Sequence, residues 1–142
     1  MPLRLGLLIV SAVIVVLLVG ARSDFDACEQ ARTDVLAAAA GAKPQSVQEQ
    51  AISDIRAHCR GAQSLVSAAA VLYEQGDLDE AQALAQEAVD AEPDNATAWN
   101  GLAVTSAEND PATARRAAAR AVELSPLDPP AVPLEPEAPA GP

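Results

Sequence analysis

The chain begins with an uninterrupted apolar run, and beyond it apolar and polar positions follow one another at helical spacing. Residues 5–21 contain no charged side chain and lie between Arg4 and Arg22. After residue 21, apolar residues recur every three or four positions, and no segment alternates with the two-residue period of a strand. This pattern predicts an all-α fold of three antiparallel helical hairpins that follow an N-terminal hydrophobic helix.

The first hairpin is predicted within residues 24–61. Gly41 and Pro44 mark the end of its first helix, because glycine suits the position after a helix and proline cannot continue one. Ser46 and Glu49 have the spacing of a capping box, which predicts the start of the second helix. The first helix, residues 24–40, carries an apolar stripe of Phe25, Cys28, Val35 and Ala39.

Both cysteines fall at the open end of this hairpin. Cys28 lies 15 residues before Lys43 in the turn and Cys59 lies 16 after it, so their side chains are expected at the same height on facing helices. We therefore predict a disulfide, which closes a loop of about 31 residues and stabilises the fold by roughly 3–4 kcal/mol. Such a bond persists in an oxidising compartment, so the pairing also predicts export. Two buried free thiols are the alternative.

His58 adjoins Cys59, which raises the question of a metal site or a catalytic Cys–His pair. Neither is expected, because neighbouring helical residues point about 100° apart and the three candidate ligands lack the close spacing of zinc sites. His58 is interpreted as a solvated residue near a helix end. No metal, cofactor or catalytic residue is predicted, since the serines also lack a neighbouring base. A thiol-redox role of a cleaved, secreted form is an alternative.

The strongest regularity is an internal repeat in residues 62–126. An offset of 33 residues aligns two second helices, and an offset of 34 aligns the helices before them, so one residue is lost inside the second repeat. The pairs at offset 33 are Gly76–Asn109, Ala81–Ala114, Ala85–Ala118, Ala88–Ala121, Val89–Val122, Asp90–Glu123 and Pro93–Pro126. The pairs at offset 34 are Leu65–Trp99 and Ala69–Ala103.

Acidic residues mark where the second helix of each repeat begins. Asp77 is expected to cap a helix over residues 78–91, with Glu80 completing the reciprocal hydrogen bond. Asp110 is expected to cap the last helix, with Pro111 in its first turn.

The repeat resembles the tetratricopeptide repeat family. The residues similar to the family pattern are Trp99, Leu102 and Ala103 at its start, Gly76 and Ala81 in its middle, and Ala88 and Pro93 at its end. The pattern is broken where Ser106 replaces a bulky residue, and where Ala85 and Ala118 replace an aromatic one. The resemblance implies a short solenoid in which residues 62–125 form two repeats and the first hairpin acts as the missing N-terminal one.

The resemblance also implies a concave groove that binds a peptide or protein segment. Its lining would comprise Gln63, Val66, Ala70, Tyr73 and Glu74 from the first repeat, and Thr97, Asn100 and Val104 from the second. Tyr73 and Asn100 are the expected specific contacts, through an amphipathic ring and an amide that can bond a backbone. The lining contains no lysine, so the clamping of a terminal carboxylate, known from similar domains, is not expected.

The N-terminal segment, residues 1–23, is interpreted as a transmembrane anchor, with a cleavable signal peptide as the alternative. At 1.5 Å per residue, its apolar run spans roughly 25 Å, slightly less than the ~30 Å of a hydrocarbon core. Val19 and Ala21 supply the small residues that precede a signal cleavage site. Because Arg4 favours an N-terminus inside the cell, we expect a single-pass protein of the cell membrane whose body is extracytoplasmic, or a secreted protein after cleavage.

Charge and composition narrow the partners. The net charge of −11 opposes nucleic-acid binding, which needs a basic stripe, and the preference for Arg over Lys resembles GC-rich bacterial genomes. Residues 126–142 are too rich in proline to pack, which predicts a disordered tail. The outer side of the last helix, from Ala112 to Leu124, is kept soluble by its arginines or is covered by a partner or a second copy.

These features predict a non-enzymatic scaffold or adaptor for protein–protein interaction at the outer face of the cytoplasmic membrane. A self-associating structural protein of the cell envelope is the alternative.

Overall fold

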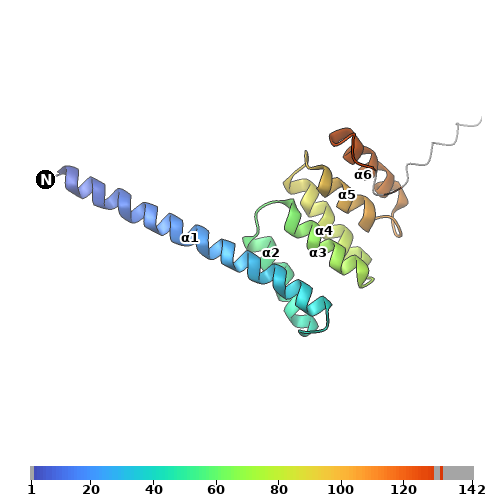
Figure 1. Ribbon diagram of the computed structural model, residues 1–142, viewed down its shortest axis with the longest axis horizontal. Helices are drawn as coiled ribbons and strands as arrows, with labels where there is room; N and C mark the ends of the chain where they lie inside the picture. The colour runs from blue at the N-terminus through green and yellow to red at the C-terminus, as the bar shows by residue number, and fades with distance from the viewer. Residues whose placement is uncertain (1, 130–131, 133–142) are drawn as a thin grey trace, which may run out of the picture. The chain divides into compact units, whose positions relative to one another are not determined.

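The described chain is helical. This computed structural model describes the backbone of residues 2–129 and 132, and the side chains of residues 18–20, 22–129 and 132. Within these residues there are six helices and no strand (Figure 1). They are α1 (Pro2–Ala39), α2 (Gln45–His58), α3 (Ala62–Glu74), α4 (Leu78–Ala91), α5 (Ala96–Thr105) and α6 (Pro111–Leu124). The all-α prediction is confirmed.

The helices belong to two compact units. The first unit is Met1–Cys59, in which α1 packs against α2. The second unit is Arg60–Pro142, in which α3 packs against α4 and α5 packs against α6. Since α5 also contacts α3 and α4, it is the central helix of the second unit.

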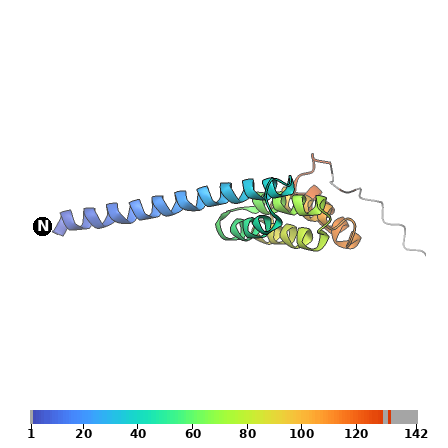
Figure 2. The same ribbon diagram turned by 90° about the horizontal axis from the view of Figure 1, so that it is seen from below.

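α1 is one continuous helix of 38 residues that extends well beyond the part paired with α2 (Figures 1 and 2). The predicted helix over residues 24–40 is therefore only the C-terminal part of a longer element. Among the described residues, no helix combines the length and the apolar character needed to cross a membrane. Most side chains of the predicted anchor or signal, residues 5–21, lie outside the described ones, as does most of the predicted tail, residues 126–142.

The core of the first unit is small and aliphatic. It consists of Ala31 and Val35 from α1 and Ala51, Ile52 and Ile55 from α2, beside the buried amide of Gln48. The prediction that Phe25 shares this face is wrong, because its side chain is 66% exposed. The buried positions of α1 follow the four- and three-residue spacing of Cys28, Ala31 and Val35, and Phe25 lies off that line.

The turn between α1 and α2 is closed by Gly41, as predicted. Gly41 has φ +72°, its N–H donates to Ala38 O at 2.9 Å, and the N–H of Ala42 donates to Ala37 O at 2.8 Å. This is the Schellman arrangement, which favours glycine. The predicted capping box is wrong, because α2 begins one residue earlier and Ser46 lies inside its first turn.

The second unit is packed mainly by alanine, which lets helices approach closely. Its fully buried larger side chains include Leu84 and Leu102. α3 and α5 begin at residues 62 and 96, and α4 and α6 begin at residues 78 and 111, so the two helix types repeat at the predicted offsets of 34 and 33. The repeat seen in the sequence is thus a repeat of helices.

The two predicted caps of the second helices have different outcomes. The Asp110 side chain accepts a hydrogen bond from the Thr113 N–H at 3.1 Å, with Pro111 in the first turn, so this cap is confirmed. Asp77 occupies the N-cap of α4, but its side chain makes no capping bond. The reciprocal bond predicted with Glu80 is also wrong, because the N–H of Asp77 donates to Leu72 O at 3.0 Å.

Candidate functional site

α3 carries five of the predicted groove residues along one stripe. Gln63, Ala70 and Glu74 are exposed, and Val66 and Tyr73 are half-buried. The opposite side of α3 supplies buried residues, including Leu72, to the core of the second unit. The helix ends where Gly76, at φ +83°, donates its N–H to Tyr73 O at 3.0 Å.

α5 carries the other three groove residues and lies beside α3 (Figure 1). Thr97 is exposed, and Asn100 and Val104 are half-buried. The approach of the helices is closest at Gly101, where an added Cβ would lie 3.0 Å from Val66 Cγ1. The structure thus places the predicted lining on two adjacent helices, and its role in binding stays a prediction.

Tyr73 is held in place by a residue that the sequence analysis did not single out. Its hydroxyl donates a hydrogen bond to Glu108 Oε1, in the turn after α5, at 2.9 Å. The bond to Glu108, together with partial desolvation and the negative charge of Glu108, raises the pKa of Tyr73 above its ordinary value. Since the hydroxyl proton is committed to Glu108, the ring is the part of Tyr73 left to contact a ligand.

Asn100 is less available than the sequence suggested. Its amide oxygen Oδ1 is buried and has no hydrogen-bond partner among the described residues. Leaving such an acceptor unpaired destabilises the fold, and reaching the backbone of a ligand would require the side chain to rotate. Ser106, where the family pattern has a bulky residue, is likewise buried with an unpaired Oγ.

Glu92 joins two distant parts of the second unit and was also missed. Its Oε2 accepts from Asn95 Nδ2 at 2.6 Å, and its Oε1 accepts from the Ala62 N–H at 2.9 Å, at the start of α3. The bonds from Asn95 and then from Ala62 lower the pKa of Glu92. Gly61, at φ +92°, leaves room for this carboxylate, because an added Cβ would lie 2.7 Å from Oε1.

The loop between α4 and α5 is ordered by two further bonds. Asn95 caps α5 by accepting the Thr97 N–H at 2.9 Å. The indole Nε1 of Trp99 donates to Pro93 O at 2.7 Å. Asparagine directly before a helix is a recognisable capping signal, so this part of the site could have been found in the sequence.

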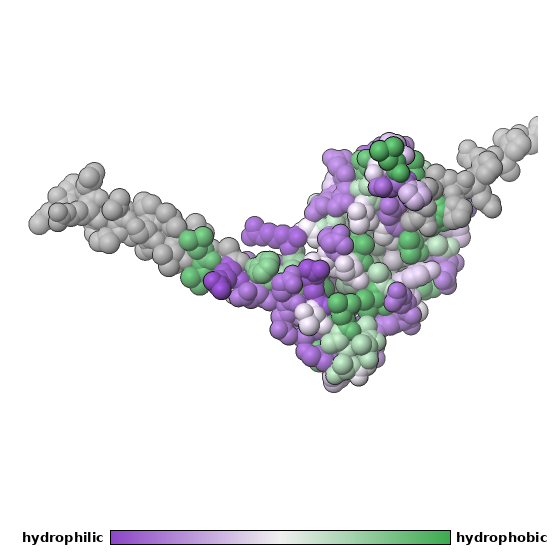
Figure 3. All heavy atoms as spheres, viewed as in Figure 1, coloured by the Kyte–Doolittle hydropathy of each residue, from purple (hydrophilic) through white to green (hydrophobic). Residues whose placement is uncertain are grey.

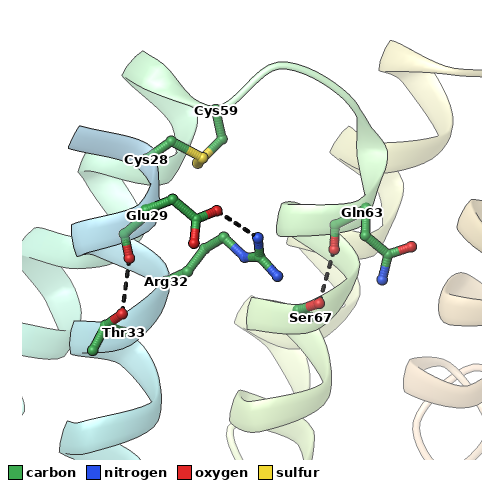
Figure 4. Close-up of polar contacts among 7 residues, drawn as sticks. All are labelled: Cys28, Glu29, Arg32, Thr33, Cys59, Gln63 and Ser67. Atoms are coloured by element: carbon green, nitrogen blue, oxygen red, sulfur yellow. Dashed lines mark hydrogen bonds and ion pairs between the residues drawn. A yellow bond between two sulfur atoms is a disulfide. The ribbon is translucent and has the colours of Figure 1, made fainter. Parts of the chain in front are cut away.

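The first unit contains the predicted disulfide. The sulfur atoms of Cys28 and Cys59 are 2.06 Å apart, and Figure 4 shows the bond between α1 and the end of α2. Cys59 is the residue that ends α2, so the link closes the open end of the hairpin, as the symmetric spacing about Lys43 predicted.

His58 does not join the cysteines in a site. Its Nδ1 lies 3.5 Å from Asp24 Oδ1, across the hairpin. In the part of the chain that the structure describes, no group of three or more His, Cys, Asp or Glu residues is arranged to hold a metal ion.

The outer side of α6 carries the arginines that the sequence placed there. Arg115 and Arg116 are exposed, whereas the alanines on the opposite side of α6 are buried. Arg120 bridges Asp94 at 3.7 Å and Glu123 at 2.9 Å. A charged outer side favours solvation by arginines, and self-association from Ala112 to Leu124 stays a prediction.

Comparison with known proteins agrees with the helical repeat. Residues 62–105, which span α3, α4 and α5, match the sequence model of the tetratricopeptide repeat family. No curated protein matches the chain. The match covers the segment in which the predicted offsets, the glycine-closed turn of Gly76 and the paired helices occur together. The chain is therefore a tetratricopeptide-repeat-like protein.

Proposed function

We propose that this protein is a non-enzymatic adaptor that holds a segment of another protein along α3 and α5. Repeats of this family generally bind protein partners on the surface formed by successive helices. The observation that carries the proposal is that eight predicted lining residues lie on two neighbouring helices, with Ala70 and Thr97 exposed at the centre and at the start of the stripe.

The chemistry of this surface favours a neutral or basic segment with an apolar side chain. Val66, Ala70 and Val104 provide an apolar strip, and the ring of Tyr73 lies at one end of it. The charged group beside that ring is the carboxylate of Glu108. A partner presenting its own terminal carboxylate would be repelled there, in agreement with the lack of lysines.

A cellular place at the outer face of the cytoplasmic membrane is part of the proposal. The Cys28–Cys59 disulfide supports it, because such bonds persist in oxidising compartments. The apolar run of residues 5–21 supplies the means of attachment in the anchor interpretation. Fractionation with an alkaline carbonate wash tests this: a full-length chain retained in the membrane supports the anchor, whereas release of a shortened chain contradicts it.

The binding surface is tested by crosslinking in cells. A photoreactive amino acid at Ala70 or at Thr97 is expected to capture the same protein, because the two positions lie on adjacent helices of one surface. Gln86 is the matched control, since it is an exposed residue on α4 outside the predicted lining.

The outcomes separate the adaptor from its alternatives. Capture of one protein from Ala70 and Thr97 and not from Gln86 supports the adaptor. Capture only from Gln86, or no protein product from any position, contradicts it. If both positions capture another copy of this chain, self-association takes the place of the adaptor function.

A further inference from the structure

Large apolar side chains stand exposed on α1. Leu18, Phe25 and Leu36 have 65%, 66% and 61% of their surface exposed, and Phe25 is the one phenylalanine of the chain. Figure 3 shows apolar residues on α1 next to the grey segment. They lie outside the small core that α1 forms with α2. Exposed residues of this size on one helix face indicate an interaction surface.

These residues fall on a regular line along the helix. The line, called the α1 seam below, comprises Leu18, Arg22, Phe25, Glu29, Arg32 and Leu36. Its members are separated by four and three residues in turn, which is the spacing of the contact line in a two-stranded coiled coil. Each member follows a core-facing position by one residue, a rotation of about 100° around α1, so α2 leaves the seam uncovered.

The charged members of the seam are complementary to themselves. Arg32 Nη1 lies 2.8 Å from Glu29 Oε1, and both side chains are close to half exposed (Figure 4). When two identical helices lie parallel and in register, Glu29 of each copy is one layer from Arg32 of the other. An interface between two identical copies requires such self-complementarity, and charged residues at contact positions also specify register.

We propose that α1 forms a parallel, two-stranded coiled coil with a second copy of this chain along the α1 seam. The apolar layers at Leu18, Phe25 and Leu36 supply the attraction, and the Glu29–Arg32 layers set the register. The proposal is independent of the adaptor function, because the seam and the groove lie on different units. It gives one molecule two groove surfaces, which would strengthen binding to a partner with two copies of the recognised segment.

Sedimentation equilibrium of the full-length chain in detergent tests the dimer. The wild type is expected to show a monomer–dimer equilibrium, and F25E/L36E is expected to raise the dimer dissociation constant by at least about tenfold, because two apolar layers are lost. L127E is the matched control, since Leu127 is 97% exposed and lies outside the seam, and it should leave the constant unchanged. Circular dichroism checks that each variant keeps its helix content.

A wild type that stays monomeric at all concentrations overturns the proposal, as would packing of the seam within one chain. A dimer that survives F25E/L36E also overturns it, because the contact must then lie elsewhere.

Charge reversal tests the register. R32E is expected to weaken the dimer, because the carboxylate it introduces meets that of Glu29 in the second copy, and E29R/R32E is expected to restore it. Failure of the double variant to restore association overturns the register. A photoreactive residue at position 25 should crosslink to position 25 of the second copy, whereas crosslinks to the far end of the seam would show an antiparallel pair and overturn the parallel one.

Discussion

Removal of the Cys28–Cys59 disulfide should strongly destabilise the first unit. The perturbation is Cys28→Ser combined with Cys59→Ser, which keeps the side-chain size and removes the link. With 31 residues between the cysteines, the loss of loop-closure entropy from the unfolded chain predicts a destabilisation of about 3.7 kcal/mol at 25 °C.

This amount is large for so small a core. The fully buried side chains larger than alanine in the hydrophobic core of the first unit are Val35, Ile52 and Ile55, and burial of each contributes roughly 1.5–3 kcal/mol. The disulfide therefore stabilises the hairpin about as much as one or two of its core residues. For a unit of this size the thermal midpoint should fall by roughly 15–30 °C.

Two probes separate the units. Trp99, the one tryptophan of the chain, lies in the second unit, so its fluorescence follows the unfolding of that unit, whereas circular dichroism at 222 nm follows both. In the serine variant, the dichroism should lose helix at lower temperature or urea concentration while the Trp99 transition stays in place. The wild type under reducing conditions should behave like the variant.

An unchanged dichroism transition in the variant would refute the reasoning, because the unfolded chain would then gain no freedom from loss of the link. A Trp99 transition that moves together with the dichroism would instead refute the independent folding of the two units, and leave the size of the effect to be measured on the whole chain.

Three further predictions concern the second unit. Because the pKa of Glu92 is lowered in the fold, its carboxylate stabilises the fold above the pKa that it has in the unfolded chain. This contribution is lost as the pH falls through the folded-state pKa, so the Trp99 urea midpoint should fall less on acidification in Glu92→Gln than in the wild type; equal pH dependence would contradict the contact with Ala62. Gly61→Ala should lower the same midpoint at neutral pH, since φ is +92° and the added Cβ meets the Glu92 carboxylate; an unchanged midpoint would show that the carboxylate does not sit there. Leu102→Ala should cost about 2–5 kcal/mol by urea denaturation, because the side chain is 2% exposed, whereas any similar loss in Leu127→Ala would speak against the assigned core.

The resemblance of the groove to its sequence prediction has a clear physical basis. Positions on one stripe of a helix are set by the 3.6-residue period, so residues such as Ala70 and Thr97 could be placed on exposed stripes of their helices in advance. The bonding state of each side chain could not. Tyr73 lies 35 residues from Glu108, its hydrogen-bond partner, and no local pattern indicates such a pair.

The sequence by itself determined those features whose causes are local. Helix period, the glycine at Gly41 and Gly76, the cap at Asp110 and the spacing of the two cysteines each act within one turn or one hairpin, and each was recovered. Only the tertiary structure decided the exposure of Phe25, because that depends on how far α2 extends along α1.

The tertiary structure also decided the contacts that join separate elements. Glu92 reaches the start of α3 across 30 residues, and Gly101 admits Val66 of another helix. Such contacts depend on how helices pack, and packing is determined by the shapes of many side chains together. The period of a sequence specifies which side of a helix is buried, and leaves open which neighbour covers it.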